Sequence, residues 1–348
     1  MLRKFLFINL FILLWLLTPR TSSAQQVKAA LIGFYNLENL FDTIKAPGVI
    51  DDEFLPNGPR VWNTEKYTSK LKNMSSVISE LGTDITPDGV AILGVSEVEN
   101  RLVLEDLIAQ PALKDRGYKI VHYDSPDRRG VDVGLLYQPK YFTVNDAESL
   151  PVLIYDDKGS RIYTRDILHV TGTMDNEVFH ILVGHWPSRR GGEARSAPLR
   201  NAAADVCKKL YDSLSVVSPN VNFIVMGDLN DDPVDPSVRQ HLKAHGSRDK
   251  VKKGNLFNPM TELYKKGYGT LAHNDTWGLF DQIIVSYGLL NDGDNGFELL
   301  KPVIYKKNYL IQKTGNFVGY PFRTFDGDLF INGYSDHFPV YLIFTKKM

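Results

Sequence analysis

The amino-acid sequence predicts an α/β fold in which two mixed β-sheets pack face to face and helices cover them on the outside. Short apolar runs typical of buried strands recur along the 348 residues, and some neighbouring runs are separated only by a turn. Amphipathic patterns with helical spacing lie between other runs. Because hairpins give antiparallel pairs and intervening helices allow parallel ones, the predicted sheets contain both kinds of pairing.

The expected strands begin near the N-terminus and continue to the end of the chain. Two pairs are predicted hairpins, at 118–137 and 167–183, because only a polar loop or turn separates their apolar runs. In chain order, the predicted strands are 30–34, 90–95, 118–123, 131–137, 167–172, 179–183, 221–226, 283–286 and 340–344.

Apolar side chains at helical spacing predict helices that pack on these sheets. The first helix has Thr64 as its expected N-cap and Gly82 just past its end. Residues 42–61, rich in Pro, Gly and Asp, are expected to form a loop, and 243–269 and 291–328 to be surface insertions. The positions that define the helices are Tyr67, Leu71, Met74, Ile78 and Leu81, then Leu104, Leu107 and Ile108, then Leu199, Ala203, Val206 and Leu210.

The N-terminal segment has the pattern of a secretory signal peptide. Two basic residues precede an apolar stretch at 5–17, and small residues follow at 21–24. This stretch is shorter than the roughly 20 residues that a transmembrane helix needs, so an uncleaved anchor is the less favoured alternative. The sequence therefore predicts a secreted or periplasmic protein with a signal peptide at 1–24, a single domain at 25–348 and no stable membrane anchor.

Charge and cysteine content narrow the function classes. The chain has 40 basic and 41 acidic residues, and three of the basic ones lie in segment 1–24, so the remaining chain carries a net charge of −4. Bulk charge gives no case for a nucleic-acid-binding surface, although a local basic patch stays open. The single cysteine, Cys207, excludes intramolecular disulfides and is expected on the buried face of a helix.

Polar side chains stand at the ends of the predicted strands, where strands deliver them to a sheet edge. The residues concerned are Asn36, Glu97, His185, Asp228, Asn230, Asp281, Asp336 and His337. They are rich in oxygen and include no cysteine, which suits Mg²⁺, Mn²⁺ or Ca²⁺ better than zinc. Each alone has a plain structural explanation, such as an Asx turn at 228–230. Together with the two histidines, which can act as a base or stabilise phosphate charge, they favour metal-assisted phosphoester hydrolysis.

Seven short motifs carry a resemblance to a known group of enzymes, and their order along the chain also fits. They are Asn36-Leu37-Glu38-Asn39, Ser96-Glu97-Val98-Glu99, the run from Arg129 to Tyr137, Gly184-His185-Trp186-Pro187-Ser188, Gly227-Asp228-Leu229-Asn230-Asp231, Phe280-Asp281-Gln282-Ile283 and Ser335-Asp336-His337. On these residues the chain resembles the endonuclease/exonuclease/phosphatase superfamily with the DNase I-like fold, as a secreted bacterial-type member. The resemblance implies a four-layer α/β/β/α sandwich with a site at one edge of its sheets.

The resemblance implies a metal site and a phosphate site. Glu97 would be the main metal ligand, assisted directly or through water by Asn36 and Asp336. Asn230 would bind a phosphate oxygen. The planar guanidinium of Arg129 matches a position from which it reaches a phosphate.

The resemblance also implies the proton-transfer groups. His337, oriented by Asp281, would be the base-like partner of the attacking water or would hold the phosphate, and Asp228 is the competing candidate for activating water. His185 would stabilise the charge of the transition state or the leaving group. The family pattern pairs this histidine with a second carboxylate, and Asp132 is the candidate here, although strand alternation argues against it.

The substrate stays open at the level of sequence. Export makes extracellular nucleic acid a plausible target, and Arg189 and Arg190 beyond His185 are candidates to contact its phosphates, so a nuclease-type phosphodiesterase is favoured. The alternative is a phosphatase or phospholipase-type enzyme acting on a small or lipid-linked phosphate ester, such as inositol phosphate or sphingomyelin. The sequence shows no exposed aromatic hairpin, which disfavours a sphingomyelinase. A non-enzymatic binding protein is disfavoured because no site residue is missing, and we expect a monomer without a protein partner.

Overall fold

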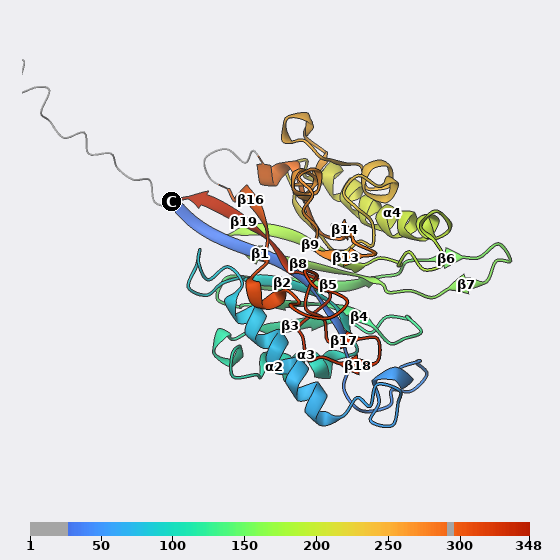
Figure 1. The fold of residues 1–348 in the computed structure, drawn as a ribbon. Coiled ribbons are helices and arrows are strands. Elements are labelled where there is room, and N and C mark those ends of the chain that lie inside the picture. The colour runs from blue at the N-terminus through green and yellow to red at the C-terminus, as the bar shows by residue number, and fades with distance from the viewer. Residues whose placement is uncertain (1–26, 291–295) are drawn as a thin grey trace, which may run out of the picture.

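Two β-sheets lie face to face in the computed structural model, which describes residues 27–290 and 296–348 (Figure 1). The first sheet has six strands in the order β16-β19-β1-β2-β4-β3 and the second has seven in the order β11-β12-β15-β10-β9-β8-β5. Both are mixed, since β1 pairs with β2 in parallel and with β19 antiparallel, and β10 does the same with β9 and β15. The predicted signal peptide at 1–24 lies outside the described residues.

The strand bounds agree with the predicted order. The first sheet contains β1 (Val27–Leu40), β2 (Ile92–Val98), β3 (Lys119–His122), β4 (Asp132–Tyr137), β16 (Glu298–Ile304) and β19 (Val340–Lys347). The second contains β5 (Thr143–Leu150), β8 (Ile167–Met174), β9 (Glu177–His185), β10 (Asn222–Asp228), β11 (Ala244–His245), β12 (Leu256–Phe257) and β15 (Asp281–Ser286). Three two-stranded ribbons are β6 (Ile154–Tyr155) with β7 (Arg161–Ile162), β13 (Leu271–His273) with β14 (Thr276–Gly278), and β17 (Phe325–Asp326) with β18 (Leu329–Phe330).

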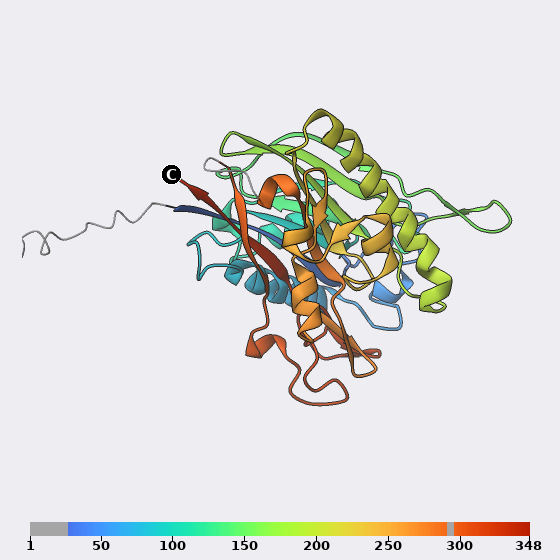
Figure 2. The ribbon, with the colours of Figure 1, turned by 90° about the horizontal axis from the view of Figure 1, so that it is seen from above.

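Helices cover the outer faces of both sheets (Figures 1 and 2). Helices α2 (Thr64–Glu80) and α3 (Arg101–Ile108) pack on the first sheet, α4 (Glu193–Val217) packs on the second, and the short α5 (Met260–Lys265) contacts β15. Short helical turns are η1 (Asp52–Phe54), η2 (Lys114–Arg116), η3 (Ser237–His241), η4 (Arg248–Lys250), η5 (Tyr287–Leu290) and η6 (Asn308–Leu310). The predicted α/β/β/α architecture is therefore confirmed. In the described part of the chain, no helix has the length and apolar character needed to cross a membrane.

Alternation along the central strands builds the apolar layers. In β1, Leu31 and Tyr35 face the helices α2 and α3, whereas Ile32 and Phe34 face the second sheet. Cys207 lies buried on α4, in the layer between that helix and the second sheet. Since both faces of the central strands are buried, their sequences read as continuous apolar runs.

Two predicted surface insertions are part of the sheets instead. Within 243–269, β11 and β12 extend the second sheet, and within 291–328, β16 lies at the edge of the first sheet. The prediction was wrong because β11 and β12 are only two residues long, and Leu299 is the one buried residue of β16. The edge strand β5 was missed because it is largely polar and exposed.

Two local expectations also differ from the structure. The N-cap of α2 is Asn63, whose side chain accepts a hydrogen bond from the backbone N–H of Lys66, so Thr64 is the first helical residue. The hairpin of β6 and β7 projects from the body of the molecule in Figures 1 and 2 and carries the exposed side chains of Tyr155 and Tyr163. The absence of an exposed aromatic hairpin was thus a wrong expectation, and it no longer argues against a lipid-linked substrate.

Candidate active site

Three neighbouring strands of the second sheet place one half of the site in a row. Asp228, the last residue of β10, pairs in register with His185 at the end of β9 and with Asp281 at the start of β15. A side chain on Gly227, the residue before Asp228, would bring its Cβ to 2.1 Å from the carbonyl oxygen of Gly184. Glycine at this position therefore allows β9 and β10 to deliver their polar ends side by side.

The first sheet supplies the other half of the site at the ends of β1 and β2. The register between these strands shifts after Asn36, and that between β2 and β4 shifts around Glu97. Glu97 has a φ of 59°, and Glu38 and Asn39 have φ values of 48° and 52°, in the left-handed region that disfavours side chains. Bulges and strained residues of this kind re-aim side chains and are concentrated at functional sites.

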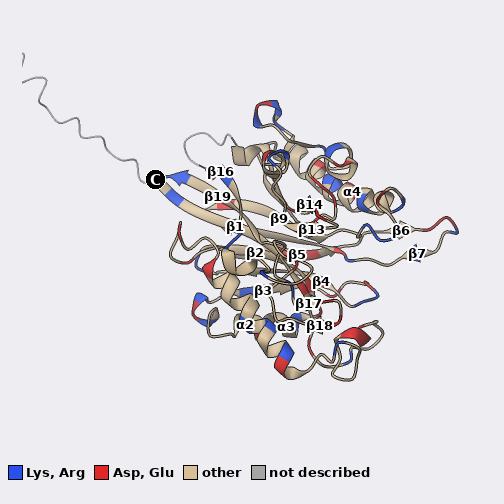
Figure 3. Cartoon of the chain, in the orientation of Figure 1, with Lys and Arg blue, Asp and Glu red and all other residues tan. Residues whose placement is uncertain are grey.

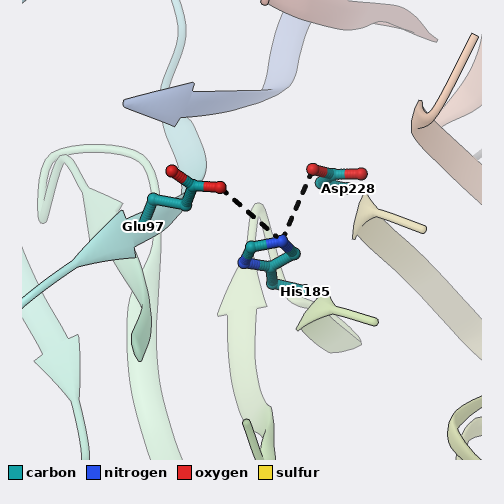
Figure 4. Close-up of side chains that lie close together, drawn as sticks. All are labelled: Glu97, His185 and Asp228. Atoms are coloured by element: carbon teal, nitrogen blue, oxygen red, sulfur yellow. Dashed lines mark ion pairs between the residues drawn. The ribbon is translucent and has the colours of Figure 1, made fainter. Parts of the chain in front are cut away.

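Glu97 and Asp228 converge on one ring nitrogen of His185 (Figure 4). The Nε2 atom of His185 lies 3.8 Å from Oε1 of Glu97 and 3.6 Å from Oδ2 of Asp228. The Nδ2 atom of Asn36 lies 3.0 Å from Asp228 Oδ2 and 3.3 Å from Glu97 Oε1, and its Oδ1 accepts the backbone N–H of Glu38. Asn36 therefore holds the two carboxylates together as a hydrogen-bond donor, and its predicted role toward a metal, direct or through water, stays a prediction.

His337 forms a second group beside this cluster. Its Nδ1 lies 2.6 Å from Oδ2 of Asp281, and its Nε2 lies 3.9 Å from Asp228 Oδ2 and from Asp336 Oδ1. The Ser335 hydroxyl donates to the carbonyl oxygen of Asn36 and accepts the backbone N–H of His337. The Ser-Asp-His turn is thereby tied to the end of β1, with the free ring nitrogen of His337 directed at Asp228.

Burial and charge give the two histidines opposite protonation. Burial opposes protonation of His337, but the carboxylates of Asp281, Asp228 and Asp336 raise its pKa well above the ordinary value. His185 has carboxylates nearby, yet burial, together with the positive charges of Arg165 and Arg129, holds its pKa well below the ordinary value. The site thus combines a cationic histidine with a neutral one.

Asp228 is the most perturbed acid of the site. Burial raises its pKa to about 7, an effect that His337 opposes and that Asp281 and Glu97 reinforce. An acid with this pKa is held in a state that a positive charge can readily ionise. Its Oδ2 lies 3.6 Å from Nε2 of His185 and 3.9 Å from Nε2 of His337, distances at which its charge acts on both rings without a direct hydrogen bond.

The donor atoms fit a divalent cation. One oxygen each of Glu97 and Asp228 and a nitrogen of His185 lie within 4.8 Å of one another. Two carboxylates with one neutral imidazole suit Mg²⁺ or Mn²⁺. When both carboxylates are ionised, their two negative charges exceed the single positive charge of His337. Asp336 has a partly exposed side chain, at 34%, facing the same space from the first sheet side.

Asn230 follows Asp228 in an Asx turn, which the sequence allowed as its plain explanation. Its backbone N–H donates to Oδ1 of Asp228, its side-chain nitrogen donates to the carbonyl oxygen of Trp186, and its φ is 50°. One N–H of the amide remains for a ligand. The role of Asn230 in binding a phosphate stays a prediction.

The arginines named from sequence fall into different settings. Arg189 is bound by a group of carboxylates, at 2.7 Å from both Glu193 and Asp235, and lies over the ring of Phe280. This geometry favours a structural role and argues against the predicted phosphate contact. Arg129 and Arg190 are exposed and line a cavity beside the site.

Arg165 is a positioning residue that lies outside the motifs identified in the sequence. It is buried, donates to the carbonyl oxygens of His185 and Trp186, and pairs with Asp127 at 2.9 Å. The predicted partner of His185, Asp132, instead binds His122 and Ser125. In the described part of the chain the Nδ1 atom of His185 is buried without a hydrogen-bond partner, so no second carboxylate orients this ring.

A buried lysine ties α2 to the turn that carries Asp336. The Nζ atom of Lys70 lies 2.6 Å from the Thr324 hydroxyl and from the carbonyl oxygen of Tyr334, and 3.5 Å from Glu38. Glu38 also accepts the backbone N–H and the hydroxyl of Thr324. The sequence signal was a lysine within the apolar stripe of the first predicted helix, three residues after Tyr67 and four before Met74.

Replacing Lys70 by methionine is expected to destabilise the protein by about 3 to 5 kcal/mol, because the carboxylate of Glu38 stays buried without its cation. Urea unfolding followed by circular dichroism measures this loss, and Lys72→Met, on the exposed side of the same helix, is the matched control. Equal unfolding midpoints for the two variants would show that the Lys70 network contributes no stability.

Comparisons with known proteins agree with this architecture. A family model described as Endonuclease/Exonuclease/phosphatase family matches residues 31–346. No curated protein matches the sequence. Among solved structures, D. rerio TDP2 complexed with single strand DNA product has a TM-score of 0.54 and 11% identity, covering 91% of this chain and 99% of that one. A mannosyl-6-phosphatase of Bacteroides thetaiotaomicron has a TM-score of 0.53 and 14% identity, covering 90% of this chain and 99% of that one. The human Nocturnin catalytic domain with bound sulfate anion has a TM-score of 0.52 and 14% identity, covering 92% of this chain and 97% of that one.

Proposed function

Because the chain belongs to the endonuclease/exonuclease/phosphatase family, whose members are hydrolytic enzymes that generally use divalent metal ions, we propose that it is a secreted, Mg²⁺- or Mn²⁺-dependent phosphodiesterase of nuclease type. The observation that carries the proposal is the meeting of two groups of side chains where strands of both sheets end. The Glu97, His185 and Asp228 cluster offers a cation site, and the Asp281–His337 pair stands within 4 Å of it.

In the proposed mechanism, the side chains of the site bind a cation, stabilise charge on the phosphate and accept a proton from water. A divalent ion held by Glu97 and Asp228, with His185, would supply Lewis acidity toward a phosphate oxygen. His337, cationic through Asp281, can donate a hydrogen bond from Nε2 to a phosphate oxygen that gains charge in the transition state. The carboxylate of Asp228, which a bound cation would keep ionised, is then the proposed acceptor for a proton of the attacking water.

We therefore propose Asp228 as the base and His337 as the donor to the phosphate, of the two candidates that the sequence left open. A histidine that is already protonated has no free nitrogen to accept a proton, whereas the carboxylate of Asp228 does. The reverse assignment would require His337 to be neutral despite three carboxylates around it.

The substrate proposal rests on the neighbours and on the N-terminal pattern. One similar structure is described with a single-stranded DNA product and another as a sugar phosphatase, so both a nucleic acid and a small phosphate ester remain candidates. We favour nucleic acid because the predicted export of residues 25–348 gives access to extracellular strands. A mature N-terminus at Gln25, read by mass spectrometry of protein recovered from outside the cytoplasm, would support the export.

A substrate panel tests the proposed function. We expect the mature protein with Mg²⁺ or Mn²⁺ to hydrolyse plasmid DNA, RNA or bis(p-nitrophenyl) phosphate, and a chelator to stop the reaction. Asp228→Asn, which keeps the size of the side chain, serves as the inactive control. Release of inorganic phosphate from inositol phosphate alone would replace the nuclease by a phosphatase, and choline phosphate release from sphingomyelin would replace it by a phospholipase type. Hydrolysis that persists in chelator would contradict the metal dependence.

A further inference from the structure

A cavity of about 650 Å³ opens directly beside the cation cluster and is rich in arginine. Arg60, Arg128, Arg129 and Arg190 all line it, together with Asn39. The backbone N–H of Asn39 donates to Oε2 of Glu97, so the cavity and the cluster share a wall. A volume of this size is typical of small-molecule sites.

Three segments far apart in the sequence bring these arginines together. Arg60 lies at the end of the loop 42–61, Arg128 and Arg129 lie in the loop between β3 and β4, and Arg190 follows the His185 turn. Such convergence places like charges around one space, which costs free energy unless an anion occupies it.

The charges of the lining are only partly neutralised within the protein. Arg60 lies 3.3 Å from Glu53 and 3.8 Å from Asp328 and packs over two phenylalanine rings, and Arg129 lies 3.6 Å from Asp127. Among the residues that the structure describes, no carboxylate lies within ion-pair distance of Arg128 or Arg190. Asp52 and Glu53 are the only carboxylates in the described lining, so its net charge is positive.

Arg165 has a structural role and serves as a comparison for the arginines of the cavity. It is buried, and its guanidinium is bound by Asp127 and two carbonyl oxygens. Arg128 and Arg190, by contrast, are exposed, and Arg128 has only the ring of Tyr163 at 6.0 Å. These two guanidinium groups keep their donors available for a ligand.

We propose that this cavity binds a second phosphate of the substrate, next to the phosphate that is hydrolysed; the inference rests on the proposed function. Guanidinium groups bind phosphate oxygens in pairs of hydrogen bonds, and Arg128 and Arg190 offer two such forks. Arg129 lies between the cavity and the cation cluster, since it lines the cavity and its positive charge also lowers the pKa of His185. The substrate class is therefore an ester with at least two phosphates, either neighbouring phosphates of a nucleic-acid strand or two phosphates on a small polyol.

Substrates that differ by a single phosphate test the proposal. The first pair is a dinucleotide with one internal phosphodiester and the same dinucleotide with an additional terminal phosphate at the 5′ or the 3′ end. The second pair is inositol monophosphate and inositol bisphosphate. We expect the additional phosphate to raise kcat/KM by about tenfold or more in one of the pairs, mainly through KM, and the pair that responds identifies the source.

For Arg128→Gln and Arg190→Gln, we expect the ratio of kcat/KM with and without the additional phosphate to fall toward 1. The control Lys253→Gln removes a charge beside the opposite end of β15 and is expected to keep the wild-type ratio. Circular dichroism establishes that the variants are folded. An enzyme that hydrolyses both members of each pair with equal kcat/KM, or arginine variants that retain the full preference, would overturn the second phosphate site. If wild-type protein hydrolyses none of the four substrates or the diesters of the panel above, the proposed function fails and this inference with it.

Discussion

Replacing His337 by alanine is expected to lower the rate of phosphodiester hydrolysis by about 10²- to 10⁴-fold. The side chain is buried, its Nδ1 is held 2.6 Å from Asp281, and its Nε2 faces Asp228. Alanine removes the cation at the position where negative charge grows on the phosphate, and the neighbouring histidine cannot replace it, because burial holds the pKa of His185 well below the ordinary value. Steady-state kinetics with bis(p-nitrophenyl) phosphate and with DNA measure the loss.

A matched control and a double variant separate this effect from a general loss of folding. His241 is half-buried and paired with Asp205 on the outer side of the second sheet. It gives the control His241→Ala, for which wild-type rates are expected. Asp281→Asn should slow the reaction alone but add nothing to His337→Ala, because the two side chains act as one unit. Fully additive losses would contradict the pairing, and near-wild-type rates for His337→Ala would remove the histidine from the mechanism.

Replacing Glu97 by glutamine is expected to weaken the binding of Mg²⁺ and to lower the rate by about two orders of magnitude or more. The substitution keeps the shape of the side chain but removes one of the two carboxylates of the cation cluster. Activity titrated against Mg²⁺ and Mn²⁺, and isothermal titration calorimetry with Mn²⁺ in the absence of substrate, measure the two effects independently.

Glu105→Gln is the matched control for this experiment, since Glu105 is exposed on α3 and pairs only with Arg101. We expect it to bind Mn²⁺ like the wild type. If Glu97→Gln retains both the metal affinity and the rate, the cation does not bind at this cluster, and the fit of its donor atoms has no catalytic meaning.

Local patterns predicted most of the fold and the chemical character of the site. Buried strands can be recognised as continuous apolar runs, and the polar residues that directly follow such a run lie where the strand ends. The Asp281–His337 pair was expected from the resemblance, and the structure shows its hydrogen bond. The two edge strands of the second sheet, β11 and β5, could not be predicted because they are too short or too polar to leave such a pattern.

Partners set by tertiary contact could not be predicted from sequence. Nothing in the sequence distinguishes Arg165 from Arg189. In the structure, Arg165 is buried and donates to the carbonyl oxygen of His185, whereas Arg189 forms an ion pair with Asp235. The direction of the Asn36 amide depends on a single backbone N–H of Glu38 that fixes its oxygen. Such choices are made by neighbours distant in sequence, and hydrophobic periodicity carries no information about them.

The place of the last strand has a consequence for the moment at which the protein becomes active. Although β19 comes last in the sequence, it lies inside the first sheet, between β16 and β1, and the turn before it carries Asp336 and His337. A ribosome must therefore finish residues 336–347 before the N-terminal strand β1 gains its antiparallel neighbour. Asp336 and His337 therefore join the other side chains of the site only after the C-terminal segment has paired with β1, and the site is incomplete in any shorter nascent chain.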